Sequence, residues 1–160
     1  LLNDWLKKLS ATDDSKEKRE LLRRIVVVGA YLKRRNNLIL VNEQDGVIKE
    51  EELNLSIQEM IKNLQLAGIH CAGTVEFEID LPTDVAMKLF DFYEYVVENA
   101  FDGLGSLLAR FFYRDNSFYA CIDAVCSLDL TKLQNEQIFV SVSDKNCYTL
   151  SLKIEGGDGR

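Results

Sequence analysis

Residues 75–103 read VEFEIDLPTDVAMKLFDFYEYVVENAFDG, and this stretch decides the fold. Its first six residues alternate between apolar and acidic side chains, which predicts a half-buried strand. Pro82, the only proline in the chain, comes next and favours the first turn of a helix. Apolar residues then recur at helical spacing, so we expect one long helix over about residues 83–112.

Upstream of this stretch, apolar periodicity predicts three helices, over residues 1–9, 16–42 and 49–67. A short segment with turn chemistry joins the second helix to the third, which makes these two a helical hairpin. The apolar stripe of the second helix is too broad for burial on one side only. We therefore expect a homodimer through residues 16–67, in which two hairpins form a four-helix bundle.

Downstream, alternation predicts three strands, at residues 117–125, 137–143 and 147–154, with a brief helical turn within 128–133. The predicted fold class is therefore α+β: a helical hairpin followed by an α/β sandwich whose long helix packs on a mixed β-sheet. We divide the chain into residues 1–68, the N-terminal helix and dimerisation hairpin, and residues 69–160, the sandwich domain.

The composition is that of a globular domain, with 28% charged and 47% hydrophobic residues in a chain of 160. No apolar run approaches the ~18 residues that a membrane span needs. The chain begins without Met, so we expect it to be a piece of a longer protein. The four cysteines include no C-x-x-C pair and only one histidine accompanies them, which argues against a zinc site.

The net charge of −7 is unevenly distributed. Residues 16–35 hold eight Lys or Arg and two Glu, whereas the rest of the chain is strongly acidic. A basic helix can contact nucleic acid, but this one has little aromatic interleaving and gives no strong nucleic-acid signal. A solvated face, or one that opposes acidic neighbours, explains the charge better.

Two short stretches resemble a known family. Residues 97–103, VENAFDG, resemble the N-box of the gyrase, chaperone and kinase superfamily (GHKL), and residues 29–38, GAYLKRRNNL, resemble a hairpin helix of sensor kinases from low-GC Gram-positive bacteria. The layout as a whole is similar to the C-terminal cytoplasmic region of a bacterial sensor histidine kinase. The resemblance implies two-component signalling, a location at the soluble end of a membrane-anchored protein, and a response regulator or other signalling protein as partner.

The resemblance also implies the site residues. Asn99 would supply an oxygen to the Mg²⁺ that bridges the phosphates of ATP, the cofactor of the family. Asp123 would take the place of the acidic residue that accepts a hydrogen bond from adenine. Glu94, Glu98 and Asp102 are nearby carboxylates, and family members that hydrolyse ATP use a helix Glu as general base. The spacing does not select one of the three.

Three features depart from the family pattern. The only histidine, His70, lies beyond the hairpin, where it cannot serve as the usual phospho-acceptor. No glycine lies between Gly105 and Gly156, so the glycine-rich turn and phosphate cradle are missing. Only about ten residues, 127–136, are available for the ATP lid. The departures favour a degenerate, kinase-like module that dimerises and relays an upstream signal with weak or absent ATP binding.

Two alternatives remain open on the sequence alone. One is an active ATP-dependent histidine kinase or ATPase with an unusual pocket, which leaves open whether the chain is an enzyme. The other is a non-enzymatic nucleic-acid or protein binding module, because a fold does not by itself determine a function.

Overall fold

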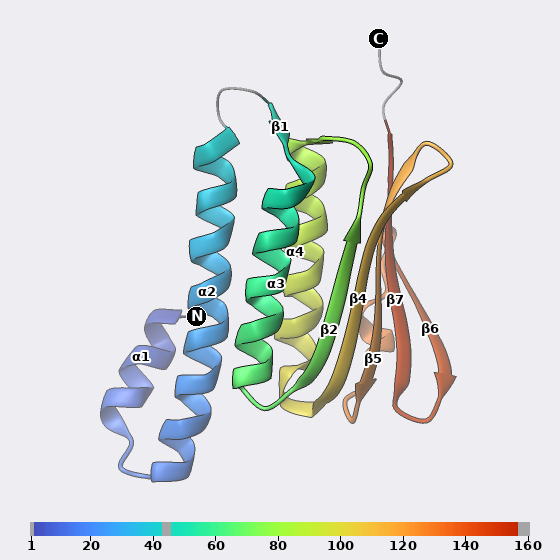
Figure 1. Cartoon of the computed structure of the whole chain (residues 1–160). Helices are drawn as coiled ribbons and strands as arrows, with labels where there is room; N and C mark the ends of the chain where they lie inside the picture. Colours follow the sequence, from blue (N-terminus) through green and yellow to red (C-terminus); the bar gives the residue numbers. More distant parts are fainter. Residues whose placement is uncertain (1, 43–45, 157–160) are drawn as a thin grey trace.

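The computed structural model describes residues 2–42 and 46–156 of the chain (Figure 1). Within these ranges the α-helices lie on one side of a five-stranded sheet, whose other face carries no helix. The α+β architecture predicted from the sequence, a long helix packed on a mixed sheet, is confirmed. None of the helices in the described ranges combines the length and the apolar character that crossing a membrane requires.

The first three helices are α1 (Leu2–Ala11), α2 (Ser15–Asn42) and α3 (Glu50–Leu66). They agree with the predicted ranges to within about two residues, because their start and stop signals are local. Asp14 precedes α2 and accepts a hydrogen bond from the backbone N–H of Lys16 at 2.7 Å, as a helix cap does. Beyond α3, Gly68 adopts a φ of +85°, which glycine reaches without strain.

Strand β2 (His70–Glu76) begins and ends earlier than the alternating pattern predicted. Its pairing with β4 ends at Glu76, and Phe77 is buried without belonging to a strand. Ile79, which the pattern placed on the buried face of a strand, is instead exposed. The chain turns there towards β3 (Leu81–Pro82), a two-residue strand that pairs with β1 (Val47–Ile48).

The predicted helix over residues 83–112 is wrong in its second half. Helix α4 (Thr83–Ala100) ends in a single 3₁₀ turn, and residues 104–114 form an additional strand, β4. Two glycines explain the break, since both disfavour a helix interior. At Gly103 a Cβ atom would lie 2.6 Å from the side chain of Ser127 and 2.9 Å from the backbone N of Leu128, so only glycine fits here without displacement.

The remaining strands are β5 (Ser117–Cys126), β6 (Ile138–Asp144) and β7 (Cys147–Glu155), as the alternation predicted. The sheet order is β2-β4-β5-β7-β6, with β2 parallel to β4 and all other neighbours antiparallel. Asp115 and Asn116, at φ 49° and 56°, form the tight turn from β4 to β5. The predicted helical turn is present as a 3₁₀ turn at residues 131–133.

The core lies between the sheet and the helices α3 and α4. The apolar stripe of α3 is buried there and consists of Leu53, Ile57, Met60, Ile61 and Leu64. Helix α2 packs on α3 and α4 on their side away from the sheet (Figure 1). The buried core is continuous from Val27 of α2 to Leu152 of β7. The division of the chain at residue 68 therefore stays a prediction, and the buried stripe of α3 is not available to a second copy.

Helix α2 has apolar residues on its outer side as well. Its exposed apolar side chains are Leu22, Val26, Leu32 and Leu40. Gly29 lies among them, and a Cβ atom added to it would meet nothing within 4 Å. The breadth of the stripe noted in the sequence therefore reflects two faces, one packed on α3 and α4 and one open to solvent.

Candidate functional site

Asn99 lies in the last turn of α4, where the resemblance placed the magnesium ligand. Its side-chain amide donates a hydrogen bond to the backbone carbonyl of Tyr95 at 2.8 Å, which leaves its oxygen free to accept. Asn99 also lines a cavity of about 500 Å³ bounded by α1, α2 and α4. It therefore belongs to the helix layer of the molecule.

Asp123 lies on the opposite side of the sheet. It alternates along β5 with Ile122 and Ala124, which are buried against the helices, so its side chain is on the face that carries no helix. There it accepts hydrogen bonds from Arg110 at 2.8 Å and from the hydroxyl of Thr149 at 2.6 Å. The structure does not bring Asn99 and Asp123 together, and their roles in nucleotide binding stay predictions.

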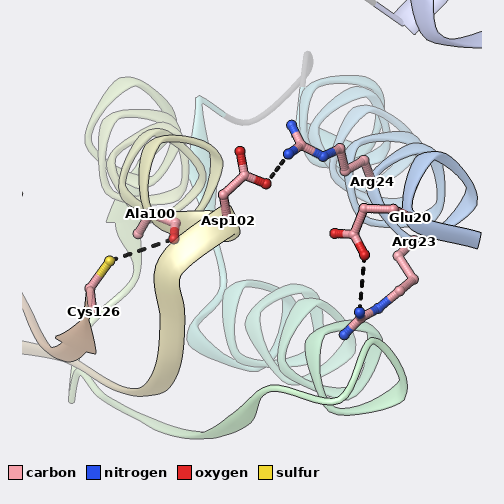
Figure 2. A network of polar contacts seen from close by, with 6 residues as sticks. All are labelled: Glu20, Arg23, Arg24, Ala100, Asp102 and Cys126. Atoms are coloured by element: carbon pink, nitrogen blue, oxygen red, sulfur yellow. Dashed lines mark hydrogen bonds and ion pairs between the residues drawn. The ribbon is translucent and has the colours of Figure 1, made fainter. Parts of the chain in front are cut away.

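The three carboxylates singled out in the sequence differ in their surroundings. Asp102, just beyond α4, forms an ion pair with Arg24 of α2 (Figure 2). Glu98 is exposed and lines the same cavity as Asn99. Glu94 lines it too, but this residue is only 8% exposed. Burial first, and then the nearby charges of Glu98 and Asp91, raise the pKa of Glu94 to about 7.

Another carboxylate on α4, which the sequence did not single out, binds two side chains of α2. Asp91 accepts hydrogen bonds from the hydroxyl of Tyr31 at 2.6 Å and from two guanidinium nitrogens of Arg35 at 2.9 and 3.2 Å. Burial, followed by the hydrogen bond to Asp91, raises the pKa of Tyr31 above its ordinary range, so the phenol keeps its proton. The Tyr31 ring also stacks on Phe90 at a centroid distance of 5.3 Å.

These contacts account for much of the basic charge of α2. Arg24 pairs with Asp102, Arg34 with Glu59 and Arg35 with Asp91, so three of its arginines face acidic residues of the same molecule. Arg23 pairs with Glu20 within the helix at 3.2 Å (Figure 2). Four of the eight basic residues at positions 16–35 therefore meet acidic neighbours within the molecule.

Comparison with known proteins bears on the fold. The sequence matches no family model and no curated protein. Solved structures are similar in fold: the histidine kinase AdeS of Acinetobacter baumannii has a TM-score of 0.50 at 10% identity, over 98% of this chain and 94% of that one. This likeness spans the helices and the sheet together.

The fold is that of histidine kinases. The blue-light activated histidine kinase of Erythrobacter litoralis is similar as well, with a TM-score of 0.52 at 10% identity over 88% of this chain and 55% of that one. A bacterial phosphotransferase matches with a TM-score of 0.51 at 12% identity, over 94% of this chain and 85% of that one. At these identities the likeness establishes the histidine-kinase fold alone.

Within the histidine-kinase fold, the segment expected to be the lid connects β5 to β6. Leu130 and Leu133 of this segment are buried in the core. Asp129 accepts hydrogen bonds from both the backbone N–H and the hydroxyl of Thr131, which closes the turn. Asn135 then accepts hydrogen bonds from two backbone N–H groups at the start of β6. The segment is thus a short connection anchored at both ends.

Two residues that line the cavity beside Asn99 were missed by sequence reasoning. Trp5 of α1 and Arg24 of α2 contact each other, with the guanidinium carbon 5.9 Å from the centre of the indole ring. Trp5 was visible only as one member of an amphipathic helix. Nothing in the local pattern indicated that α1 folds back to face the end of α4, which is a long-range contact.

Proposed function

We propose that the chain is a signalling module with a histidine-kinase fold that acts through helix contacts and binds Mg·ATP weakly or not at all. The observation that carries this proposal is the placement of Asn99 and Asp123 on opposite sides of the sheet. A nucleotide that contacts both would have to reach through the packed core. In addition, Glu94 and Glu98 line the cavity beside Asn99, where their negative charge opposes a polyphosphate.

The β5–β6 connection supports weak nucleotide binding in a second way. A lid that closes over phosphates has to move away from the core and back again. Here the connection contributes Leu130 and Leu133 to the core, and freeing either would expose buried apolar surface. A phosphate cradle also needs backbone N–H groups that point at the ligand, and the connection has no glycine to help arrange them.

The proposed output is a movement of α2 relative to α4. Three ion pairs join α2 to α3 and α4, and two of them, Arg24–Asp102 and Arg35–Asp91, end on α4 or directly beyond it. A displacement of α2 that originates upstream would therefore reach the helix that covers the sheet. In this proposal the chain is the cytoplasmic end of a membrane-anchored protein, and its partner is a response regulator or another signalling protein.

The proposed dimer rests on the outer face of α2. Leu22, Val26 and Leu32 are exposed on this helix, while the corresponding stripe of α3 is already buried. Helices that expose such a stripe commonly associate with a second copy. The proposal therefore narrows the dimer contact from the whole hairpin, residues 16–67, to α2.

Calorimetric titration of Mg·ATP into the chain, with Asn99→Ala as the paired variant, tests the first part. We expect no saturable heat up to millimolar nucleotide in either protein. Saturable binding in the micromolar range that Asn99→Ala abolishes would replace the proposal with an active kinase or ATPase.

Sedimentation equilibrium tests the second part. We expect the chain to be dimeric, Val26→Glu to make it monomeric, and Val125→Glu to leave it dimeric, since Val125 is exposed to a similar extent but lies on β5. A chain that stays monomeric at high concentration would contradict the dimer.

A further inference from the structure

The cavity between α1, α2 and α4 has one acidic wall and several apolar walls. It measures about 500 Å³, which is within the range of small-molecule sites. Glu94 and Glu98 of α4 form the acidic wall, and Trp5, Val27 and Phe101 contribute apolar ones. A cavity that brings apolar walls and convergent polar groups together is suited to a small ligand.

Glu94 is the more buried of the two glutamates that line the cavity. As a residue it is more than nine-tenths buried, and it lines the cavity. Its carboxylate accepts no hydrogen bond from any residue in the described part of the chain. Its charged neighbours Glu98 and Asp91 repel it. The carboxylate oxygens are not sealed inside the protein, so a donor that enters the cavity can reach them and replace water.

The one arginine among the described residues that line the cavity is already paired with another carboxylate. Arg24 also lines the cavity, but its guanidinium is paired with Asp102 (Figure 2). It lies 5.9 Å from the ring centre of Trp5 and 5.7 Å from that of Phe101, which holds both rings against the cavity. With Arg24 neutralised by Asp102, the two glutamates leave the cavity negatively charged.

We propose that this cavity binds a small primary amine with an apolar body, whose ammonium group donates hydrogen bonds to Glu94. The apolar body of the ligand lies between the aromatic rings and Val27. An ammonium beside Glu94 and Glu98 converts a repulsive pair into two attractive contacts, and hydrogen bonds to ionised groups are the strong ones. The same two glutamates repel a ligand that carries a phosphate or a carboxylate. The proposal depends on neither the dimer nor the relay.

Trp5 makes this binding directly measurable, because it is the only tryptophan in the chain. The probe is phenethylamine, titrated into the whole 160-residue chain while the Trp5 emission is recorded. The neutral analogue 2-phenylethanol has the same apolar body without the ammonium group. Calorimetry on the same samples detects binding that leaves the emission unchanged.

We expect saturable binding of phenethylamine and at least about tenfold weaker binding of the alcohol, since a charge-assisted hydrogen bond is lost. Glu94→Gln should weaken amine binding by about tenfold as well. Glu98→Gln, at an exposed position, should weaken it by only a few-fold. Glu78→Gln, an exposed acidic residue near the other end of α4, is the matched control and should change nothing.

Three results would overturn the proposal. One is the absence of saturable binding by both fluorescence and calorimetry up to millimolar amine. Another is equal affinity for amine and alcohol, which would indicate an apolar pocket only. The third is unchanged amine affinity in Glu94→Gln and Glu98→Gln, with each variant shown to be folded by circular dichroism. Binding of Mg·ATP in the parallel titration bears on the proposed function and leaves the amine result to be judged separately.

Discussion

The substitution Glu94→Gln should make the chain more stable at alkaline pH. The pKa of Glu94 is raised from 4.5 to about 7 in the folded protein, so the folded state holds this proton more tightly than the unfolded state. Stability then falls as pH rises from about 4.5 and levels off above about 7. Glutamine carries no charge at any of these pH values, so the variant lacks this decline.

The magnitude follows from the two pKa values. At about 1.4 kcal/mol for each pKa unit, the ionised Glu94 costs the folded state at most about 3 kcal/mol at pH 8. The carboxylate reaches a cavity that water can enter, so we expect about 1–2 kcal/mol after screening. The charged groups around it are Glu98 and Asp91 on α4 and Arg24 and Arg35 on α2, and the substitution changes none of them.

Urea unfolding, followed by far-ultraviolet circular dichroism at several pH values between about 5 and 8, measures the effect. The free energy of unfolding of Glu94→Gln minus that of the unsubstituted chain should grow steadily with pH. The control is Glu78→Gln, whose exposed carboxylate is not among the charges that raise the pKa of Glu94, so the pH profile should stay that of the unsubstituted chain. Parallel pH profiles for Glu94→Gln and the unsubstituted chain would refute the reasoning, because they would mean that Glu94 titrates normally.

Three further substitutions test the packing by urea or thermal unfolding. Asp91→Ala should lower the free energy of unfolding by about 1–3 kcal/mol, because Tyr31 and Arg35 of α2 lose their hydrogen-bond acceptor. Asp84→Ala, which removes an exposed ion pair with Lys88, should lower it by less than about 1 kcal/mol. Leu133→Ala should cost about 2–4 kcal/mol if the β5–β6 connection is as firmly anchored as its burial indicates. Gly103→Ala should destabilise the folded chain by more than about 1 kcal/mol, because the added Cβ would collide with the backbone of Leu128. Gly29→Ala lies at an open helix position and should stabilise the folded chain by about 0.5–1 kcal/mol. Equal effects of the two glycine substitutions would contradict the crowding at Gly103.

The sequence placed the first three helices well, but it extended α4 too far and so missed β4. Helix periodicity and caps are local, and so α2 and α3 could be placed to within a residue or two. The apolar stripe of α4 happens to continue in register to Leu104, the first residue of β4. The periodic pattern alone therefore extended the helix, although Gly103 and Gly105 signalled its end. To predict β4, the two helix-breaking glycines had to count for more than the single apolar residue, Leu104, that continues the helical spacing.

The site was only partly accessible to sequence reasoning. The motif around Asn99 identified the end of α4, where the cavity lies. The face of the sheet on which the Asp123 side chain lies could have been predicted, because its neighbours Ile122 and Ala124 are apolar and successive side chains of a strand point to opposite faces. The pair Arg24–Asp102 joins residues that are far apart in the chain, and no local pattern predicts such a contact.

The parallel pairing of β2 with β4 bears on how the chain folds. The pairing of His70 with Ser106 spans the whole of α4, whereas β4 and β5 follow each other through a two-residue turn. Long loops close slowly, so we expect the antiparallel strands to assemble first and β2 to join them last, together with α3. During translation the apolar faces of α3 and α4 leave the ribosome before the strands β5 to β7 that cover them. A nascent chain that stalls before β7 would thus present these faces uncovered, as a substrate for chaperones or a seed for aggregation.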